Sequence, residues 1–471
     1  MSDAGIPNST DVLVIGGGSG GYVAAIRAGQ LDMDVTLVEK DAFGGTCLNY
    51  GCIPSKALIT ASNLAFEAGN AERMGIYGDF QVDLSEMVDW KEGIVSNLTN
   101  GVEGLCRTNG VQLVNGEAKL VDEHSAVVRS EGEKEPIEFQ DAIIATGSRP
   151  VEIPGFSYSD GPILNSKQAL ALESLPEKLA IIGAGYIGIE MAGVFAKLGS
   201  DVTVVEMLDS IIPMYADDLV APVRERAEDL GINFRFGEMA SEWELAGDRV
   251  TLKTETEDGE ERTLAADKVL VAVGREPVTD TVGVQDISIS VTENGFIDTN
   301  ERCQTNYNNI YAVGDTAGEP LLAHKASMEG KTAAEVIAGE PAAVDYQTIP
   351  AVVFTEPEIA QVGWTPERAQ SSNIEFITGE FPFSASGRAL TTGTSEGFVR
   401  LIADEETGML LGGQLVGPEA SELVGEVGLA IEMGATIDDV SATIHTHPTL
   451  SEAVMEAAEN ASGRAIHTTN N

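Results

Sequence analysis

The chain has 471 residues, enough for about three domains, and its 75 acidic against 28 basic residues give a formal net charge of −47. This excess of negative charge repels phosphate backbones and argues against nucleic-acid binding. Every apolar run is broken by Gly or by a charged residue, which excludes a membrane span. The first ten residues lack the pattern of a secretory signal, so we expect a cytoplasmic protein.

The acidic excess has two interpretations. The protein can have an acidic but otherwise ordinary surface, or it can come from a halophile. In multimolar salt the Debye length falls to about 3 Å or less, so repulsion among surface carboxylates is largely screened. We favour the halophile interpretation, which predicts that folding and activity need high salt.

A glycine-rich motif lies near the start of the chain. An apolar run, residues 11–15, is followed by Gly16, Gly18 and Gly21, an Ala-rich helical stretch and a second apolar run that ends in Glu39. This order of strand, tight turn, helix and strand is typical of dinucleotide-binding units. The first glycine makes the turn, the second lets the backbone approach a pyrophosphate, and the third lets the helix pack on the strand. Glu39 is placed to accept hydrogen bonds from ribose hydroxyls.

Two cysteines, Cys47 and Cys52, follow this unit closely and open a predicted helix, in which Pro54 suits the first turn. Positions five apart lie on different helical faces, so we expect Cys47 in an irregular turn that can bring the two sulfurs within bonding distance. A helix N-terminus also favours the thiolate, the form needed for disulfide exchange. Lys56 lies on the same helical face as Cys52.

Other interpretations of the cysteine pair are weaker. A structural disulfide is uncommon in a reduced cytosol, and a zinc half-site needs further Cys or His ligands nearby, which the sequence does not supply. A redox role therefore remains the favoured one. Cys106 and Cys303 are far from the pair, and we expect both to be bystanders.

Three apolar segments end in glycine turns. Residues 141–149 turn at Gly147, and residues 268–275 repeat this pattern with Gly274. A third segment ends in a Gly-Asp pair whose acid is Asp315. The sequence predicts a strand before each turn.

A second dinucleotide unit starts at residue 179. It carries Gly183, Gly185 and Gly188, and its terminal acid, Glu206, lies 23 residues after the first glycine, the same spacing as in the first unit. One such motif is weak evidence, but two in the same structural context are strong. Glycine-rich turns without ligands are the alternative. No basic residue follows Glu206 directly, and its carboxylate would repel a 2′-phosphate, so NAD is favoured over NADP.

The remaining segments predict a hairpin and a third domain. Residues 249–264 alternate as a charged hairpin. From about residue 345 the pattern changes to strands with polar turns, followed by helices in residues 419–433 and 448–462. This C-terminal part is typical of an α+β domain.

The C-terminal part also carries a candidate base. Pro448 fits the first position of a helix, which places His447 at its start and Glu452 one turn inside. A histidine held by a carboxylate can convert a thiol to a thiolate and return the proton. A His–Glu pair alone is more often structural, but this one coexists with a cysteine pair. We favour a catalytic role for His447, whereas His445 can be a packing residue.

Four segments together make the chain similar to the flavoprotein disulfide reductases, and most of all to members that oxidise dihydrolipoamide. They are GGTCLNYGCIPSK (44–56), GAGYIGIE (183–190), YAVGD (311–315) and HTHPTLSE (445–452). The cysteine and histidine motifs are highly specific, whereas the glycine motifs fit many flavoproteins. The first fingerprint reads GGGSGG where the family more often has GAGPGG, but the three glycines are kept.

The resemblance implies two cofactors, FAD and NAD, and no metal. The first unit, with Glu39, would bind the ADP half of FAD, and Asp315 would hold the ribitol. Lys56 would pair with Glu190 beside the isoalloxazine. The second unit, with Glu206, would bind NAD.

The resemblance also implies roles for the sulfurs and the base. Cys52 would face the flavin, and Cys47 would exchange with the substrate sulfurs. His447, oriented by Glu452, would serve the disulfide of the other subunit, so the active protein would be a homodimer. The implied reaction oxidises protein-bound dihydrolipoamide to lipoamide with NAD⁺, and the implied partner is a lipoyl carrier, such as that of a 2-oxoacid dehydrogenase complex. An NADH-dependent diaphorase or reductase of another disulfide, or a docking subunit of such a complex, remains an alternative.

Taken together, these patterns predict an α/β fold with two Rossmann-like dinucleotide-binding domains and an α+β C-terminal dimerisation domain. We expect residues 1–150 to begin the FAD-binding domain and residues 276–345 to complete it. The NAD-binding domain would occupy residues 151–275 and the interface domain residues 346–471.

Overall fold

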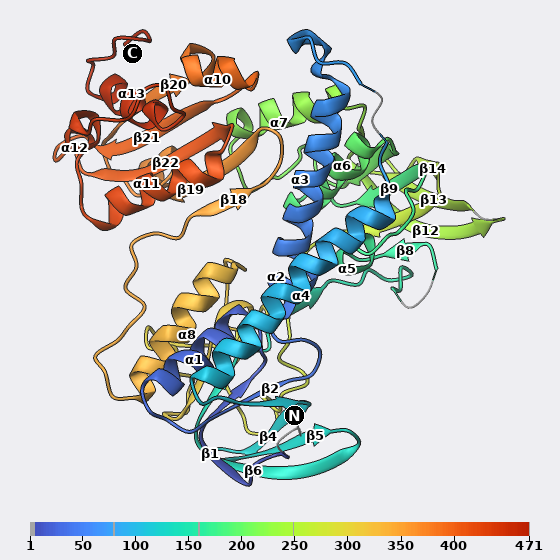
Figure 1. Cartoon of the computed structure of the whole chain (residues 1–471), viewed down its shortest axis with the longest axis vertical. Coiled ribbons are helices and arrows are strands. Elements are labelled where there is room, and N and C mark those ends of the chain that lie inside the picture. Colours follow the sequence, from blue (N-terminus) through green and yellow to red (C-terminus); the bar gives the residue numbers. More distant parts are fainter. Residues whose placement is uncertain (1–4, 79–80, 159–160, 248, 471) are drawn as a thin grey trace.

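The computed structural model describes residues 5–78, 81–158, 161–247 and 249–470. Figure 1 shows the N-terminal sheet at the bottom, a second group of strands at the right and the C-terminal unit at the upper left. Two long helices, α3 (Cys52–Gly69) and α4 (Leu84–Thr108), run between the first two groups.

The N-terminal sheet joins strands that are distant in the sequence. Its order is β3-β2-β1-β6-β5-β4, and β17 pairs with the end of β6. β3, β2, β1, β6 and β17 are parallel, whereas β5 and β4 form an antiparallel extension on the first half of β6. The bounds are β1 (Ser9–Ile15), β2 (Val35–Glu39), β3 (Gln112–Asn115), β4 (Glu117–Asp122), β5 (Ser125–Ser130), β6 (Glu133–Ile144) and β17 (Ile310–Ala312).

Helix α1 (Ser19–Gln30) of the first glycine motif packs against α8 (Ala323–Ile337), some 300 residues later. Glycines make this approach possible, since a Cβ on Gly330 would lie 2.4 Å from the carbonyl oxygen of Gly20. The turn that carries Asp315 lies between β17 and α8. The return of this late segment therefore brings Asp315 to the first glycine motif.

The second sheet is parallel throughout, in the order β11-β10-β9-β15-β8. The predicted hairpin is confirmed, and a third strand extends it into the antiparallel sheet β12-β13-β14. The strands are β8 (Ile163–Leu164), β9 (Lys178–Ile182), β10 (Asp201–Glu206), β11 (Asn233–Phe236), β12 (Glu238–Ala246), β13 (Arg249–Thr256), β14 (Glu261–Ala266) and β15 (Lys268–Val271). The helices are α5 (Ser166–Ala169), α6 (Tyr186–Leu198) and α7 (Asp217–Asp229). A short antiparallel pair, β7 (Ser148–Pro150) with β16 (Arg275–Pro277), lies where the chain enters and leaves this unit.

The C-terminal unit is an antiparallel sheet in the order β18-β19-β22-β21-β20, with helices packed on it. Its strands are β18 (Ala351–Val353), β19 (Glu358–Gly363), β20 (Phe376–Pro382), β21 (Phe398–Asp404) and β22 (Leu410–Gly417). Its helices are α9 (Pro366–Ser371), α10 (Gly387–Thr392), α11 (Ala420–Glu432), α12 (Ile437–Ala442) and α13 (Glu452–Ala461). Buried residues of α11 and α13 share one core with the sheet.

The last helix starts later than its sequence predicts. We expected it to begin at Pro448, but α13 begins at Glu452. The Glu452 carboxylate accepts a hydrogen bond from the backbone N–H of Thr449, which keeps the preceding residues in a turn. Glu452 therefore stands at the first helical position and not one turn inside.

The predicted α/β architecture is confirmed, with two parallel nucleotide-type sheets followed by an α+β unit. Among the described residues, no helix combines the length and the apolar character that crossing a bilayer requires.

Candidate functional site

Cys47 and Cys52 form a disulfide with a Cα–Cα distance of 4.7 Å. Cys47 does not lie in an irregular turn, as we expected, but inside a short helix, α2 (Gly45–Tyr50). The irregularity falls at Gly51, where α2 ends and α3 starts. A Cβ there would approach the Thr46 carbonyl oxygen to 3.0 Å, so glycine accommodates the break between the two helices. The break between α2 and α3, and not an irregular turn at Cys47, brings the two sulfurs together.

The disulfide lies in the wall of a cavity of about 440 Å³, a volume typical of ligand pockets. The predicted site residues that line the cavity come from both dinucleotide units, and they are Gly18, Glu39, Cys47, Cys52, Lys56, Gly147, Glu190 and Asp315. The space thus extends from the first glycine motif to the disulfide. The structure brings these residues together, although they span almost 300 positions of the chain.

The three glycines of each fingerprint face different constraints. A Cβ on Gly16 would lie 2.3 Å from the carbonyl oxygen of Ala145, and one on Gly21 would lie 1.8 Å from the carbonyl oxygen of Gly16. In the second unit, a Cβ on Gly188 would meet the Gly183 carbonyl oxygen at 2.1 Å. The fold itself therefore requires the first and third glycines of both motifs, because strand, turn and helix are in contact there.

The middle glycines are different, since the protein leaves room beside them. The nearest heavy atom to a Cβ on Gly18 would be 3.9 Å away, and no atom lies within 4 Å of one on Gly185. Both residues have extended backbone angles that any residue can adopt. Nothing in the chain demands glycine at these places, which indicates that a ligand approaches the backbone there.

The two terminal acids make equivalent hydrogen bonds. Glu39 accepts from the backbone N–H of Gly17 at 2.6 Å, and Glu206 accepts from that of Ala184 at 2.7 Å. Each carboxylate thus closes its own glycine turn and stands at the carboxyl end of its strand. This is where a ribose would contact it.

The turn with Asp315 is held by a partly buried network. The hydroxyl of Ser148 donates to Asp315, and Arg275 donates to the Ser148 hydroxyl at 2.8 Å. Burial lowers the pKa of Arg275 below its usual value, although the neighbouring Asp315 opposes this effect. The network links β7, β16 and the Asp315 turn on one side of the cavity.

Lys56 and Glu190 meet beside the disulfide helix. Lys56 Nζ donates to Glu190 Oε2 at 2.7 Å, and the Glu190 side chain is 5% exposed. The other carboxylate oxygen accepts from the backbone N–H of Phe354 at 2.9 Å. The predicted pair is therefore formed, and a segment of the C-terminal unit completes it.

His447 and Glu452 also form their predicted contact, with Nδ1 and Oε1 2.9 Å apart. Burial raises the pKa of Glu452, but hydrogen bonds from Thr449 and His447 outweigh this effect and leave the pKa below its usual value. The His447 side chain is 81% exposed, and it is not among the described residues that line the cavity. Within one chain the candidate base and the disulfide cavity are thus separate.

The remaining histidine and cysteine candidates show no sign of a catalytic role. His445 is buried and contacts Glu426 at 2.6 Å, as a packing residue would. Burial raises the pKa of Cys106 to about 11 and that of Cys303 to about 12, so both thiols stay protonated and unreactive at neutral pH. No group of three or more metal-ligating side chains occurs among the residues the structure describes.

Several cavity residues were not predicted from the sequence. Ser148 and Arg275 each follow a glycine that the sequence singled out, and that adjacency was the available signal. Tyr50 and Lys167 were missed altogether, and the Lys167 ammonium lies 3.5 Å from the Tyr50 ring centroid. Burial, followed by a hydrogen bond with Asp41, raises the pKa of Tyr50 to about 12, so its phenol remains protonated.

Comparison with known proteins identifies the family. Residues 10–330 match the pyridine nucleotide-disulphide oxidoreductase family, and residues 349–458 match the dimerisation domain of the same family. The chain belongs to the pyridine nucleotide-disulphide oxidoreductases. The dimerisation-domain match supports the predicted homodimer.

Individual members of this family resemble the chain over its whole length. It is 59% identical to a dihydrolipoyl dehydrogenase of Halobacterium salinarum and 58% identical to one of Haloferax volcanii, each over 99% of both chains. A crystal structure of LpdA from Mycobacterium tuberculosis superposes with a TM-score of 0.90 at 27% identity, covering 96% of this chain and 99% of that one. Relatives from halophilic archaea support the halophile interpretation of the charge.

The family also confirms the predicted cofactors, FAD and NAD. The residues present fit both of them. The first unit offers an open glycine, a carboxylate and a cavity that reaches the disulfide, whereas the second offers an open glycine and a carboxylate on the adjoining domain.

Proposed function

We propose that the protein catalyses the dihydrolipoyl dehydrogenase reaction, in which a protein-bound dihydrolipoyl group is oxidised and NAD⁺ is reduced. The observation that carries this proposal is the Cys47–Cys52 disulfide in the wall of the cavity that also holds the first glycine motif. The activity predicted from the sequence agrees with full-length relatives that bear this name, at 59% and 58% identity.

The cysteine pair performs the exchange with substrate. A substrate thiolate attacks Cys47 Sγ, the bond between Cys47 and Cys52 breaks, and Cys52 leaves as a thiolate. The second substrate thiolate then attacks the mixed disulfide, which closes the lipoyl ring and releases Cys47. Cys52 is the first residue of α3, so the helix N-terminus stabilises its thiolate. Bound FAD supplies the two-electron carrier between this dithiol and NAD⁺.

Lys56 and Glu190 give the site a fixed charge distribution. Both side chains line the cavity, and their ion pair joins the disulfide helix α3 to the nucleotide-binding helix α6. We assign them to the flavin ring and Asp315 to the ribitol chain. We also assign Gly147 and Gly274, at the turns before β7 and β16, to cofactor binding.

His447 acts as the base that takes the substrate's thiol proton and later returns it. Glu452 accepts from Nδ1 and so leaves Nε2 free to receive that proton. Since His447 is exposed and outside the cavity of its own chain, we assign it to the disulfide of the partner subunit. Two complete sites then require two chains.

The natural partner in this proposal is a lipoyl group on a carrier protein, such as that of a 2-oxoacid dehydrogenase complex, which is consistent with the name of the relatives. The NAD preference rests on Glu206, whose carboxylate disfavours a 2′-phosphate. A cytoplasmic location and the predicted domain limits stay predictions.

The test is NADH formation from dihydrolipoamide by the His447→Gln variant. We expect turnover to fall about 10²-fold or more, because a general base is lost. Reduction of a dye by NADH should be retained, since that reaction does not need the substrate base. Steady-state kinetics of the two reactions measure both effects.

The matched control is His467→Gln. His467 is also exposed, and its Nδ1 contacts Glu456 of α13 at 2.6 Å. This variant should keep dihydrolipoamide turnover near the wild-type value. Equal losses in the two histidine variants, or equal losses of both reactions in His447→Gln, would contradict the role of His447.

A further inference from the structure

A second polar cluster joins the same three elements as the Lys56–Glu190 pair. Lys197 lies seven residues after Glu190 on α6, and Asn63 lies seven residues after Lys56 on α3. Seven residues are two helical turns, so the second cluster stands on the same helical faces, about 10 Å along both helices. We name Lys56, Glu190 and Phe354 the first rung, and Asn63, Lys197, Arg226 and Glu356 the second rung.

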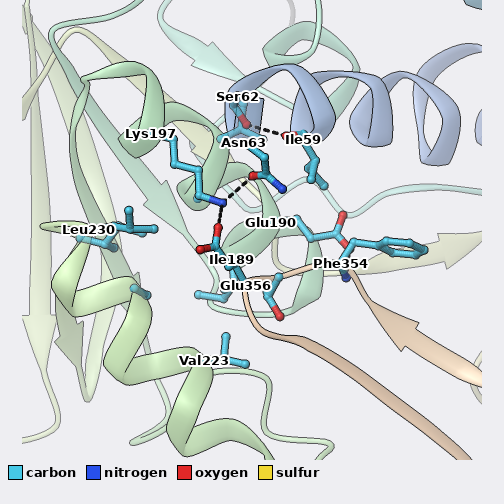
Figure 2. Close-up of a pocket in the computed structure, with 15 residues that line it drawn as sticks. Ile59, Ser62, Asn63, Ile189, Glu190, Lys197, Val223, Leu230, Phe354 and Glu356 are labelled. Atoms are coloured by element: carbon cyan, nitrogen blue, oxygen red, sulfur yellow. Dashed lines mark hydrogen bonds and ion pairs between the residues drawn. The ribbon is translucent and has the colours of Figure 1, made fainter. Parts of the chain in front are cut away.

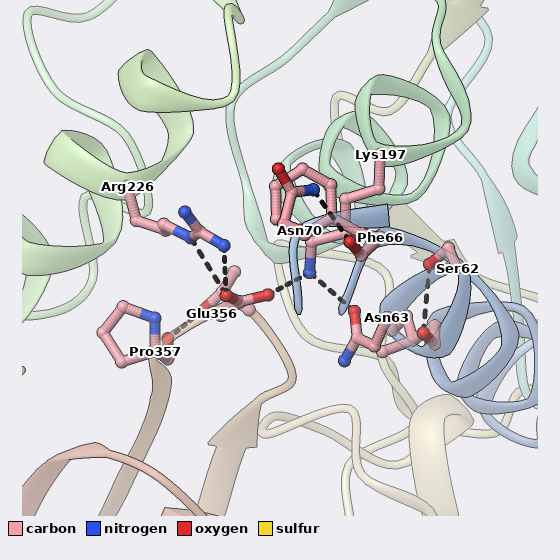
Figure 3. Close-up of polar contacts among 10 residues, drawn as sticks. Ser62, Asn63, Phe66, Asn70, Lys197, Arg226, Glu356 and Pro357 are labelled. Carbon is pink, nitrogen blue, oxygen red and sulfur yellow. Dashed lines mark hydrogen bonds and ion pairs between the residues drawn. The ribbon is translucent and has the colours of Figure 1, made fainter. Parts of the chain in front are cut away.

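The second rung is closely connected. Lys197 Nζ donates to Asn63 Oδ1 at 2.6 Å and forms an ion pair with Glu356 (Figure 3). Arg226, on α7, donates to Glu356 at 2.9 Å through Nε and at 2.5 Å through Nη2. One carboxylate of the C-terminal unit therefore holds two helices of the second unit, and through Lys197 it also holds the disulfide helix α3.

The charges of this rung differ in exposure, since the side chains of Glu356 and Arg226 are 33% and 30% exposed. The Lys197 side chain is only 5% exposed. Burial raises the pKa of Glu356, but its ion pairs with Lys197 and Arg226 outweigh this effect and keep the pKa low. Removal of the Glu356 charge leaves the buried Lys197 ammonium without its ionic partner, so we expect rearrangement around Lys197.

The two rungs are linked by three residues of backbone. Phe354 donates its N–H to Glu190 in the first rung, and Glu356 follows two residues later in the second. The ring of Phe354 also lies under Lys56, with Nζ 4.3 Å from the ring centroid. The position of residues 354–356 thus fixes both the acceptor and the aromatic contact of the first rung.

Side-chain packing between the rungs is incomplete. A small cavity of about 30 Å³ is lined by Glu190, Phe354, Lys197 and Glu356 (Figure 2). A rigid connection through packed side chains is therefore interrupted here. The rungs are therefore connected through the backbones of α3 and α6, which carry residues of both rungs, and through the backbone of residues 354–356.

We infer that the second rung, through Glu356 and Lys197, positions the Lys56–Glu190 pair for the reaction and so couples the C-terminal unit to the disulfide site. These are positioning residues, since they act through Glu190 and do not line the disulfide cavity within the described chain. The inference rests on the proposed function of the first rung beside the flavin.

The experiment is a double-mutant cycle on the holoenzyme with Glu356→Gln and Glu190→Gln. We expect Glu356→Gln to lower kcat for dihydrolipoamide about 10-fold, because small misplacements near a reacting centre are costly, with little change in the KM for NAD⁺. The visible flavin spectrum of Glu356→Gln should shift in the same direction as the spectrum of Glu190→Gln. The double variant should be no slower than Glu190→Gln alone, to within about 2-fold, because both changes act on one interaction.

A matched control separates this effect from loss of domain docking. Arg400 of the C-terminal sheet contacts Asp218 of α7 at 2.5 Å, so Asp218→Asn weakens another contact between the same two units without touching α3. We expect Asp218→Asn to keep both kcat and the flavin spectrum. Asn63→Ala removes only a neutral hydrogen-bond partner and should reproduce the Glu356→Gln effects more weakly, even if Glu356→Gln folds poorly.

Each failure has a distinct meaning. If Glu190→Gln leaves turnover unchanged, the proposed role of the first rung is wrong, and the inference falls with it. If Glu190→Gln is slow but the losses of the two single variants multiply, only the inference is overturned. Equal effects of Asp218→Asn and Glu356→Gln, or an unshifted flavin spectrum in Asn63→Ala and Glu356→Gln, would also overturn it.

Discussion

The two dinucleotide units have similar glycine turns but different surroundings. In both, the first and third glycines are forced by contacts within the chain, the middle glycine is open, and a glutamate closes the turn. Among the described residues, the first motif lines the disulfide cavity with Gly18 and Glu39, whereas the second motif lines it only with Tyr186 and Ile187, and helix α6 adds Glu190. The glycine motif therefore predicts that a nucleotide binds. The neighbouring elements decide whether that nucleotide stays bound beside the reacting atoms or exchanges with solvent.

Substitution of the middle glycine of the first unit, Gly18, should give the largest difference in effect between the two units. An Ala at Gly18 meets no protein atom closer than 3.9 Å, so the fold should tolerate it. Its methyl group would instead occupy the space of a pyrophosphate. We expect Gly18→Ala to lower the flavin content of the purified protein about 10-fold or more, with parallel loss of all activities. Absorbance of the protein, compared with its concentration, measures this.

The equivalent change in the second unit should act only on NAD. A Cβ at Gly185 also has free space, and Gly185 does not line the disulfide cavity. We expect a normal flavin content and a KM for NAD⁺ raised about 10-fold, with little change for dihydrolipoamide. Loss of flavin in Gly185→Ala would show that the first unit does not bind FAD and the second NAD as proposed.

The terminal acids should give the smallest contrast. Each accepts a backbone hydrogen bond and would lose one or two ribose contacts on truncation, worth about 1 kcal/mol each. Glu206→Ala should therefore raise the KM for NAD⁺ about 5-fold, while Glu39→Ala should weaken flavin retention without affecting that KM. An unaltered KM in Glu206→Ala would remove this residue from the NAD site.

Much of this architecture could be predicted from local sequence patterns. The glycine spacing with a terminal acid identified both parallel units, because turn, helix packing and ribose contact each constrain one position. The cysteine and histidine motifs indicated the redox chemistry. We expected Cys47 in an irregular turn, however, because a break between two helices at Gly51 leaves no periodic signal in the sequence.

Other features depend on contacts between distant segments. The late start of α13 follows from a hydrogen bond of Glu452 to Thr449, which competes with the preference of Pro448 for a first helical turn. The second rung joins Asn63, Lys197 and Glu356 from three parts of the chain, and none of them lies in a recognisable motif. Such ion pairs become visible only when the fold places their helices side by side.

Electron transfer from the cysteine pair to a bound flavin is tested most directly by an anaerobic titration of the purified protein with dihydrolipoamide, followed by visible absorbance. We expect a yellow protein that develops a long-wavelength band at two-electron reduction, because the Cys52 thiolate would then lie against the bound flavin. In Cys47→Ser, dihydrolipoamide should produce no such change, while NADH should still bleach the flavin. A colourless protein after reconstitution with FAD, or unchanged dihydrolipoamide turnover in Cys47→Ser, would contradict electron transfer from the Cys47–Cys52 pair to a bound flavin.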